Sequence, residues 1–297
     1  MIDTILKENE RIDQLFSTDV KIIQNKEVFS YSIDSVLLSR FPKLPSRGLI
    51  VDLCSGNGAV GLFASTKTNA TIIEIELQES LADMAKRSIK LNKLEKQVTM
   101  IAVGLFASTK TNATIIEIEL QESLADMAKR SIKLNKLEKQ VTMINDDLKN
   151  LLDHVQRSNV DLMLCNPPYF KASETSKKNL SPHYLLARHE ITTNLREICQ
   201  IAQHALKTKG RIAMVHRPDR FLEIIDTMRQ FNLAPKRIQF VYPKLGKDAN
   251  MLLIEAIKDG STEGMKILPP LVVHQDNGDY TETIFDIYFG ENGKSHD

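Results

Sequence analysis

The sequence predicts an α/β fold built around a mostly parallel sheet, and three observations lead to this prediction. Residues 49–53 and 160–165 are short apolar runs that stop at turn residues, a pattern typical of strands buried on both faces. A glycine loop separates the first run from a helical segment that begins near Ala59. A β-branched run over residues 70–77 follows, with an acid, Glu76, near its end. Strand, glycine loop, helix and acidic strand end, in this order, form a βαβ unit of the kind that binds nucleotides.

The other elements are predicted from apolar periodicity and from cap and turn residues. A helix begins near Ser32, where two serines stand three positions apart ahead of three apolar residues. Further on, the patterns predict helices over 194–206 and 221–231, and strands over 210–215, 236–242, 250–257 and 271–274. The chain then divides into an N-terminal extension expected to cover a ligand bound at the glycine loop (1–47), a main domain (48–258) and an acidic C-terminal tail (259–297).

The glycine loop contains the first candidate binding residues, which are Asp52, Ser55, Gly56 and Gly58. Glycines let the backbone approach a ligand closely because they carry no side chain. Glu76 stands twenty-four residues after Asp52, where an acid at the end of the second strand of such a unit accepts hydrogen bonds from ribose hydroxyls. A G-x-G loop alone also occurs in proteins that bind no nucleotide, so the assignment depends on the motif that follows.

The second apolar run is followed directly by a motif of four residues: Asn166, Pro167, Pro168 and Tyr169. Prolines cannot donate to a sheet ladder, so the motif lies in a turn at the carboxyl end of a strand. An exocyclic amino group on a planar base is a poor nucleophile, because its lone pair is delocalised into the ring. The Asn166 side-chain oxygen and the Pro167 carbonyl can each accept one N–H of such a group, while Tyr169 stacks on the ring. An ordinary turn is the alternative for these residues alone, and the upstream glycine loop favours catalysis.

The order of these features resembles that of class I S-adenosylmethionine-dependent methyltransferases. The details are most similar to the bacterial family that methylates N6 of the adenine beside the anticodon of a valine tRNA. The similar stretches are residues 29–38, 52–58, 76–79, 165–170, 188–191, 215–218 and 242–244. The resemblance implies a Rossmann-like, mostly parallel seven-stranded sheet with a C-terminal antiparallel hairpin, S-adenosylmethionine as the cofactor and tRNA as the partner. It also implies cofactor contacts from Tyr31, Asp34, Asp146 and Asp147.

Residues 59–101 and 102–144 are identical in sequence. Two identical copies indicate a recent event, namely a tandem gene duplication, an engineered change or a sequence-assembly error, rather than an evolved solenoid. Each copy holds a helix, a strand, a second helix and the start of a third strand. Ala59 is joined to the glycine loop, whereas Asp146 is joined to the second copy, so we expect a hybrid with its first helix from copy one and its third strand from copy two. Glu76 and its counterpart Glu119 are equal candidates for the ribose acid.

The net charge of the chain is +1, but its charges are unevenly distributed. Residues 166–258 hold sixteen Lys and Arg against eight Asp and Glu, and residues 259–297 hold two against eight. A basic region after the catalytic motif suits a phosphate backbone, although a solvated surface without a partner gives the same count. His189 and His216 each stand beside an arginine, and we interpret them as structural or phosphate-contacting rather than catalytic. The predicted nucleic-acid contacts are Lys171, Lys177, Lys178, Arg188, Lys236, Arg237, Lys244 and Lys247.

Length and composition indicate a soluble enzyme. At 297 residues the chain is long enough to bury a real apolar core. It has no run of eighteen apolar residues and no secretory pattern at the N-terminus, so we expect a cytoplasmic protein without a membrane segment. Cys54, Cys165 and Cys199 show no C-x-x-C spacing and are expected to be small buried residues with neither a metal nor a disulfide role. The oligomeric state is not indicated.

Together with these observations, the resemblance implies N6-methylation of an adenine in tRNA with S-adenosylmethionine as the methyl donor. The four-residue motif is shared with DNA adenine, rRNA guanine and protein glutamine methyltransferases, so it indicates the reaction type and not the substrate. A DNA enzyme is expected to carry a separate target-recognition segment, and a glutamine enzyme a longer helical N-terminal domain. The alternative from a different class is a non-catalytic RNA-binding protein whose cofactor pocket is spoiled by the duplication.

Overall fold

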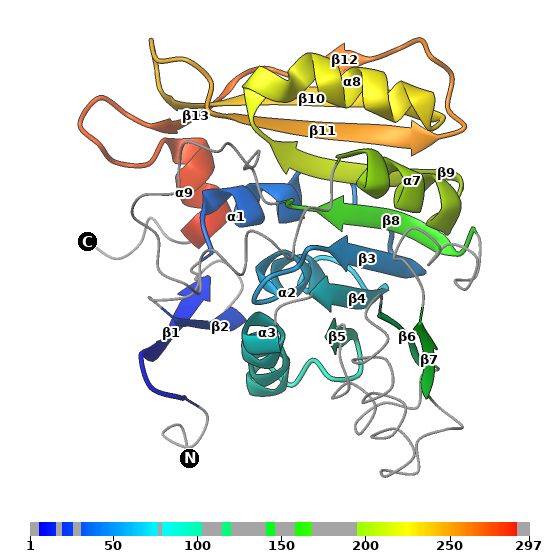
Figure 1. Ribbon diagram of the computed structural model, residues 1–297. Coiled ribbons are helices and arrows are strands. Elements are labelled where there is room, and N and C mark those ends of the chain that lie inside the picture. Colours follow the sequence, from blue (N-terminus) through cyan, green and yellow to red (C-terminus); the bar gives the residue numbers. More distant parts are fainter. Residues whose placement is uncertain are drawn as a thin grey trace, which may run out of the picture.

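A nine-stranded sheet runs through the computed structural model of the protein (Figure 1). The structure describes residues 6–15, 20–25, 31–76, 79–102, 115–119, 141–145, 158–167 and 195–289. The strands of this sheet are β3 Leu49–Leu53, β4 Thr71–Glu76, β5 Val98–Ala102, β8 Val160–Cys165, β9 Leu206–His216, β10 Leu233–Lys244, β11 Met251–Lys258, β12 Lys266–Ile267 and β13 Leu271–His274. They lie in the order β12, β10, β11, β9, β8, β3, β4, β5, and β13 also pairs with β10.

Five neighbouring strands, β9, β8, β3, β4 and β5, are parallel, so their carboxyl ends meet at one edge of the sheet. β11 runs antiparallel to both β9 and β10. This arrangement confirms the predicted α/β fold, with its mostly parallel sheet and its C-terminal antiparallel hairpin. Two short strands, β12 and β13, pair in parallel with the other side of β10, so the sheet in the described residues has nine strands rather than the expected seven. The sequence indicates β13 but not the two residues of β12.

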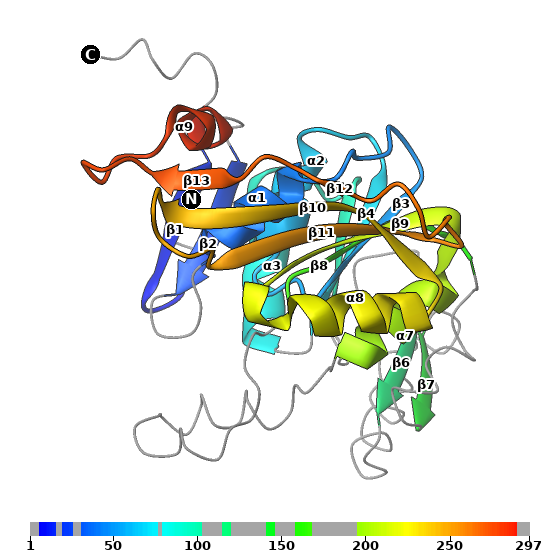
Figure 2. The same ribbon diagram turned by 90° about the horizontal axis from the view of Figure 1, so that it is seen from above.

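Helices cover both faces of the sheet (Figures 1 and 2). One face is packed by α1 Ile33–Arg40, α2 Ala59–Ser65 and α3 Glu79–Leu91. The other is packed by α7 Leu195–Ala205 and α8 Phe221–Gln230, with a 3₁₀ turn at Pro218–Arg220 before α8. The helices predicted near Ser32, near Ala59, over 194–206 and over 221–231 are therefore confirmed.

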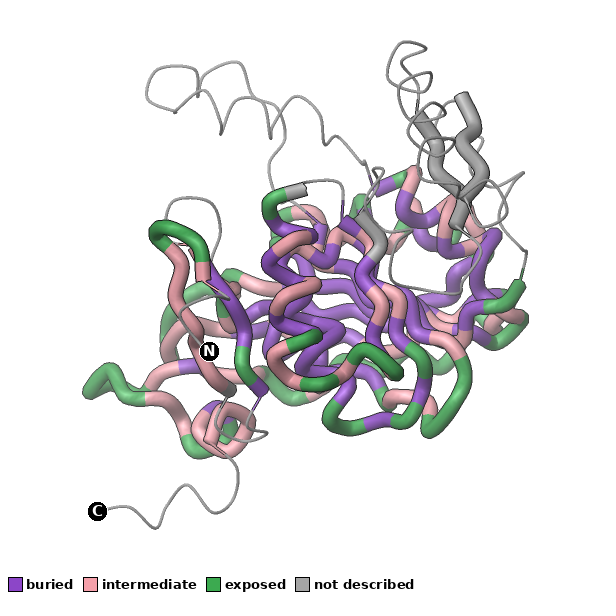
Figure 3. Tube along the Cα trace, turned by 90° about the horizontal axis from the view of Figure 1, so that it is seen from below, coloured by how far each residue is buried: buried purple, intermediate pink, exposed green. Residues whose placement is uncertain are grey.

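The core consists of two apolar layers, one on each face of the sheet. Ile50 and Leu164 belong to the layer under α1, α2 and α3, whereas Val51 and Cys165 belong to the layer under α7 and α8. Figure 3 shows that the buried part of the chain is concentrated along these strands. Because β3 and β8 are covered on both sides, their sequences read as continuous apolar runs rather than as alternating ones.

An N-terminal hairpin packs beside α3. Its strands, β1 (Glu10–Leu15) and β2 (Val20–Asn25), are antiparallel. The Ile23 N–H donates to Ser88 Oγ at 2.9 Å, and Arg87 forms an ion pair with Glu10 at 2.6 Å. The N-terminal extension is therefore attached to the main sheet through the helix that follows β4.

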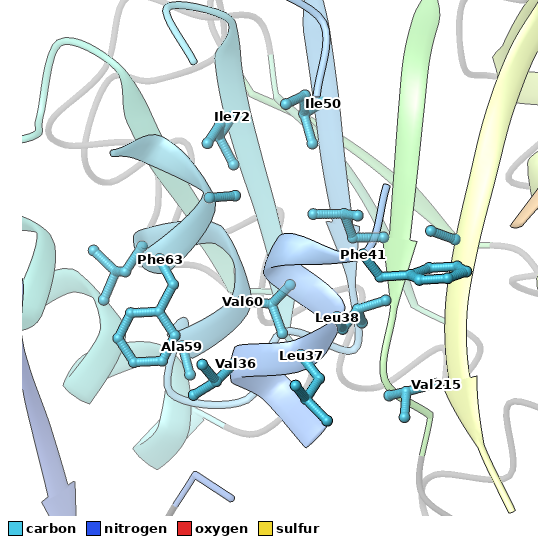
Figure 4. Packing of buried hydrophobic residues seen from close by; sticks show 14 of the residues in the cluster. Val36, Leu37, Leu38, Phe41, Ile50, Ala59, Val60, Phe63, Ile72 and Val215 are labelled. Atoms are coloured by element: carbon cyan, nitrogen blue, oxygen red, sulfur yellow. The ribbon is translucent and has the colours of Figure 1, made fainter. Parts of the chain in front are cut away.

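Helix α1 continues this extension and packs directly on α2. Figure 4 shows Val36, Leu37 and Leu38 of α1 among the buried residues of the core, near Val60 and Phe63 of α2. All five side chains are at most 3% exposed. This packing fixes the position of α1 relative to the helix that follows the glycine loop.

The two identical copies of the repeat occupy different places in the fold. The first copy supplies α2, β4, α3 and nearly all of β5, which belong to the main sheet and its covering layer. From the second copy the structure describes β6 (Ile115–Glu119) and β7 (Val141–Asn145), which pair in parallel as a separate sheet. The expected hybrid is wrong, because β5, and not the strand of copy two, pairs with β4. The connection from α3 to β5 is only a few residues long, so β5 reaches that position without displacing a whole copy.

The C-terminal segment folds onto the sheet rather than forming only a tail. Helix α9 (Glu282–Phe289) buries Ile284, which joins Val273 of β13 in the core layer of α1 and α2. Helix α9 is not expected from the sequence, because its residues are largely β-branched and aromatic and have a low intrinsic helix propensity. None of the helices in the described part of the chain has the length and apolar content needed to cross a membrane.

Candidate functional site

Two loops meet at the carboxyl edge of the parallel strands. β3 and β8 are neighbours, and Leu53 pairs with Cys165 at their ends. Residues 54–58, which follow β3, and residues 166–167, which follow β8, therefore begin side by side. The strand order changes direction here, since β4 lies on one side of this pair and β9 on the other. Open α/β sheets bind their ligands at such a point.

The glycine loop turns sharply between β3 and α2. Gly56 and Gly58 have φ angles of 59° and 82°, in the left-handed region that favours glycine. The Ser55 N–H donates to the Ile75 carbonyl at 3.0 Å, and the Gly58 N–H donates to the Ser55 carbonyl at 3.0 Å. The Gly56 N–H donates to Glu76 Oε2 at 2.7 Å. The loop is therefore attached to the end of β4, which belongs to the first copy of the repeat.

Two fully buried carboxyl groups lie beneath the loop, on paired positions of β3 and β4. Asp52 Oδ2 accepts a hydrogen bond from the Gly61 N–H at 3.1 Å. Asp52, which the sequence predicts as a cofactor contact, therefore stabilises the first turn of α2. Burial, with a smaller effect of the Glu76 charge, raises the pKa of Asp52 to about 8. Burial and the Asp52 charge raise the pKa of Glu74 well above its usual range. A Cβ at Gly58 would lie 2.7 Å from Glu74 Oε2 and 3.0 Å from Ala85 Cβ, and the positive φ of Gly58 would strain any other residue there.

Sequence reasoning missed Glu74, although a signal was present. Glu74 and Glu76 are two positions apart on a strand, so they share one face of the sheet. That face also holds Ile72 and lies under the helices, which makes a second acid there unusual. Two acids at alternate positions of a buried strand therefore indicate the face of the strand that lies against the glycine loop.

The Asn166 side chain is connected to the first turn of α1. Asn166 Nδ2 donates to Asp34 Oδ2 at 3.3 Å and to Ser35 Oγ at 3.4 Å. Asp34 Oδ1 in turn accepts from the Ser35 N–H at 2.8 Å and from the Ser32 hydroxyl. Asp34 and Ser35 are buried, and so is Pro167, which follows Asn166 in the motif. Helix α1 and the motif after β8 thus form one hydrogen-bonded unit.

Tyr31 lies just ahead of α1 and is half-buried. Its ring meets the edge of Phe63 with centroids 5.1 Å apart, and its N–H donates to Gln24 Oε1 at 2.7 Å. Burial, followed by the charge of Asp13, raises the pKa of the Tyr31 phenol above its usual value. Tyr31 is therefore a neutral aromatic side chain between the N-terminal hairpin and α2.

Two of the predicted nucleic-acid contacts are engaged within the protein. The Arg237 guanidinium lies 4.8 Å from the centre of the Phe41 ring and donates to the Phe41 carbonyl at 3.1 Å. It also lies 3.6 Å from Glu255. Lys236 Nζ donates to the Ser261 carbonyl at 2.5 Å. These contacts indicate that both side chains attach β10 to neighbouring parts of the protein.

Lys244 is the last residue of β10, and Lys247 stands in the turn that leads from β10 to β11. Because β11 is antiparallel to both β9 and β10, this turn lies at the same edge of the sheet as Asn166. Leu245 at its tip is 80% exposed, and Lys247 is exposed beside it. Lys244 Nζ lies 3.5 Å from the Asp276 carbonyl, to which it donates. This turn presents positive charge and an apolar tip on the side of the candidate site.

His216 ends β9 at this edge and is buried. Its Nδ1 accepts from the Arg217 N–H at 2.7 Å, and its Nε2 lies 3.4 Å from the Arg220 guanidinium. Burial, with a smaller effect of the Arg220 charge, lowers the pKa of His216 to about 4. A neutral imidazole with both nitrogens in contact with the following turn has a structural role, as the sequence suggested.

Two of the three cysteines carry buried thiols with a raised pKa. Cys165 and Cys199 are buried, as predicted, whereas Cys54 is half-buried with a φ of 62°. A hydrogen bond with Cys54, and then burial, raise the pKa of Cys165, and burial raises the pKa of Cys199 to about 12. Within the described residues no three His, Cys, Asp or Glu side chains gather as metal ligands do.

Several predicted residues are not brought to the site by the described structure. Glu119 is the last residue of β6, in the separate two-stranded sheet, where it pairs with Asn145. The remaining predicted residues lie outside the described residues: Asp146, Asp147, Pro168, Tyr169, Lys171, Lys177, Lys178, Arg188 and His189. Of the two candidate ribose acids, only Glu76 is held beside the glycine loop by a described contact.

The sheet order and the two adjoining loops match a class of fold, the Rossmann-like α/β fold found in methyltransferases. A solved structure from Agrobacterium tumefaciens, described as a predicted O-methyltransferase, is similar with a TM-score of 0.55 at 18% identity. The similarity covers 86% of this chain and 96% of that one, and at this identity it shows the fold alone. No family model matches the chain.

Among curated proteins, the chain is similar to enzymes named tRNA1(Val) (adenine(37)-N6)-methyltransferase. The protein from Photobacterium profundum is 21% identical over 253 residues, which are 84% of this chain and 85% of the relative. The protein from Aeromonas hydrophila is 24% identical over 251 residues, which are 84% of each chain. The overall sequence and the motifs therefore lead to the same group of relatives.

Proposed function

We propose that the chain is an S-adenosylmethionine-dependent methyltransferase that acts on the N6 amino group of an adenine in tRNA. One observation carries the proposal: the amide of Asn166 stands at the end of β8, beside the glycine loop that follows β3. An amide acceptor next to a nucleotide-binding loop holds an exocyclic amine close to a methyl donor. The names of the relatives support adenine in tRNA as the target.

The residues of the glycine loop fit this cofactor. Ser55 Oγ is buried and has no hydrogen-bond partner within the described residues, as expected of a group that awaits a polar ligand. The Glu76 carboxyl group is held at the loop by Gly56, where it is suited to accept from ribose hydroxyls. We expect Ser55, Gly56, Gly58 and Glu76 to hold the cofactor, which supplies an electrophilic methyl group on a sulfonium.

The protein's own residues act on the amine. Asn166 Oδ1 and the Pro167 carbonyl each accept one N–H of the target base, which directs the nitrogen lone pair out of the ring plane. Tyr169 stacks on the base. No general base is needed before attack, since the amine loses its proton to water afterwards. The base must leave its stack to reach this edge, which costs less in an anticodon loop than in a duplex.

The turn between β10 and β11 supports RNA as the substrate. Lys244 and Lys247 lie at the carboxyl edge of the sheet, where a phosphate backbone would pass if a base entered beside Asn166. Their contribution is electrostatic, so it weakens with salt and carries no sequence preference. Arg237 and Lys236 are not part of this proposed surface, because they donate to carbonyls within the protein at 3.1 and 2.5 Å, whereas the internal contact of Lys244 is longer, at 3.5 Å.

One observation favours a second candidate function, that of a non-catalytic RNA-binding protein. β5 ends at Ala102, so the third strand of the main sheet does not lead into Asp146 and Asp147. Asn145, which precedes them, ends β7 in the separate sheet. If a carboxylate at the end of the third strand is needed to hold the cofactor adenine, the full chain binds the cofactor too weakly to act.

Methyl transfer from labelled S-adenosylmethionine to tRNA, duplex DNA and release factor tests the proposal. We expect label in tRNA as N6-methyladenosine, and loss of that label in Asn166→Ala with cofactor affinity retained in calorimetry. Label retained in Asn166→Ala would overturn the catalytic assignment, and label only in DNA or protein would overturn the substrate. Tight tRNA binding without any cofactor binding would establish the second candidate.

A further inference from the structure

The orientation of the Asn166 amide decides whether it can hold an amine. An asparagine side chain has an accepting oxygen at one end and two donating N–H groups at the other. An exocyclic amine directs its own N–H groups at the asparagine, so only the oxygen end can receive it. A 180° rotation of the amide would place its N–H donors opposite the N–H donors of the amine. A residue that fixes this orientation therefore contributes to the reaction without touching the substrate.

We propose that Asp34 is this positioning residue, and the proposal rests on the methyltransferase function given above. Asn166 Nδ2 donates to Asp34 Oδ2 at 3.3 Å and to Ser35 Oγ at 3.4 Å. The two N–H groups of the amide thus face two acceptors on α1. A carboxylate cannot donate, so the amide oxygen is repelled from this place and is directed to the opposite side.

Asp34 is itself held in place, which is what a positioning residue requires. Its Oδ1 accepts from the Ser35 N–H at 2.8 Å and from the Ser32 hydroxyl, which leaves Oδ2 directed at Asn166. Asp34 is 8% exposed and stands in the first turn of α1, where a negative charge is favoured by the helix dipole. The packing of α1 on α2, shown in Figure 4, fixes the position of this turn relative to the glycine loop.

The sequence resemblance implies that Asp34 contacts the cofactor, and the geometry points to Asn166 instead. The two roles make different predictions for kinetics. A cofactor ligand changes cofactor affinity when it is removed, whereas a residue that acts through Asn166 lowers kcat and has no effect once Asn166 is absent.

The first test compares Asp34→Ala with Asn166→Ala and with the double variant in the tRNA methylation assay. We expect Asp34→Ala to lower kcat about ten- to hundredfold, as for the loss of a charge-assisted hydrogen bond, with cofactor affinity unchanged. In the Asn166→Ala background the same change should have no further effect. Glu8→Gln, which removes an exposed charge from the N-terminal segment, serves as the control and should leave kcat unchanged. Equal losses in both backgrounds, or a loss confined to cofactor affinity, would overturn the proposal.

A polarity swap provides a second test. Asn166→Asp sets two carboxylates against each other and should inactivate the enzyme. Adding Asp34→Asn should restore at least part of kcat, because the new amide at position 34 donates to the new carboxylate at position 166, whose other oxygen still accepts from the amine. A correctly folded double variant that stays as inactive as Asn166→Asp would contradict the positioning role.

A third readout does not depend on catalysis. In protein labelled with ¹⁵N-asparagine, the side-chain NH₂ signal of Asn166 is identified by its absence in Asn166→Ala. We expect this NH₂ to exchange slowly with solvent in the wild type and faster in Asp34→Ala, whereas Glu8→Gln changes nothing. If the wild type methylates no substrate, the proposed function fails, and this exchange rate still decides whether Asp34 holds the amide. Equal exchange in the wild type and Asp34→Ala would reject the contact.

Discussion

Two stretches of forty-three identical residues take different places in this molecule. The first copy forms the helix after the glycine loop and two strands of the main sheet, whereas the second copy contributes β6 and β7 to a separate parallel pair. β4 pairs with β3 along five residues, from Leu49 with Thr71 to Leu53 with Ile75. The identical strand β6 pairs only with β7 within the described residues. Local sequence therefore does not decide which copy enters the core; the covalent link to β3 does.

The largest expected effect comes from deleting residues 102–144. Because the copies are identical, deleting either one gives the same shortened chain, in which Ile101 leads directly into Asn145 and Asp146. We expect a carboxylate to follow the third strand there and S-adenosylmethionine affinity to rise about tenfold or more, as for a gained charge-assisted hydrogen bond. Calorimetry on the two chains measures this. Equal affinities would show that the full chain already supplies that carboxylate, against the placement of β5 and β7.

A matched pair of substitutions compares the copies by their contribution to the core. Ile72 is fully buried in β4, and Ile115 is its counterpart in β6. We expect Ile72→Ala to lower the free energy of unfolding by about 2–5 kcal/mol, because it leaves a cavity in the main core. We expect the same change at Ile115 to cost about 1 kcal/mol or less, because β6 belongs to the separate two-stranded sheet and not to the main one. Urea unfolding of both variants measures the difference, and equal losses would place both copies in the core.

A smaller effect concerns the pH dependence of stability. Burial raises the pKa of Glu74 well above its ordinary value of 4.5, so above that pH the folded state keeps a proton that the unfolded state has lost. The free energy of unfolding therefore falls as the pH rises above 4.5, with a slope of at most about 1.4 kcal/mol per pH unit from this group. Glu74→Gln should remove this part of the slope, whereas Glu117→Gln, its counterpart in β6, should keep it. An unchanged slope in Glu74→Gln would mean that Glu74 is ionised in the folded state.

The fold was predictable because its main features are local. The apolar runs that became β3 and β8, the glycine loop and the paired strands β10 and β11 all have short-range signatures in the sequence. Helix α9 was not predictable in this way, since its residues favour strands and it is held by packing of Ile284. The place of each copy was predicted wrongly, because two identical segments carry identical local signals and only their covalent links to the rest of the chain differ.

The candidate site was predictable in its types of residue but not in their contacts. Asn166 and the glycine loop follow from motifs, and their adjacency follows from the strand order. The link from Asn166 to Asp34 joins residues more than a hundred positions apart, so no local pattern indicates it. Arg237 is the opposite case. Its charge suggested a contact with nucleic acid, whereas its guanidinium already contacts Phe41 and Glu255.

The central claim is that a methyltransferase site is built from the first copy beside Asn166. The most direct test measures N6-methyladenosine in tRNA by mass spectrometry after incubation with S-adenosylmethionine and the full chain, Glu76→Gln or Glu119→Gln. We expect the wild type and Glu119→Gln to form the product at similar rates and Glu76→Gln to lose most of it, because only Glu76 is held at the glycine loop by a described contact. Equal losses in the two variants, or full activity in Glu76→Gln, would contradict the claim.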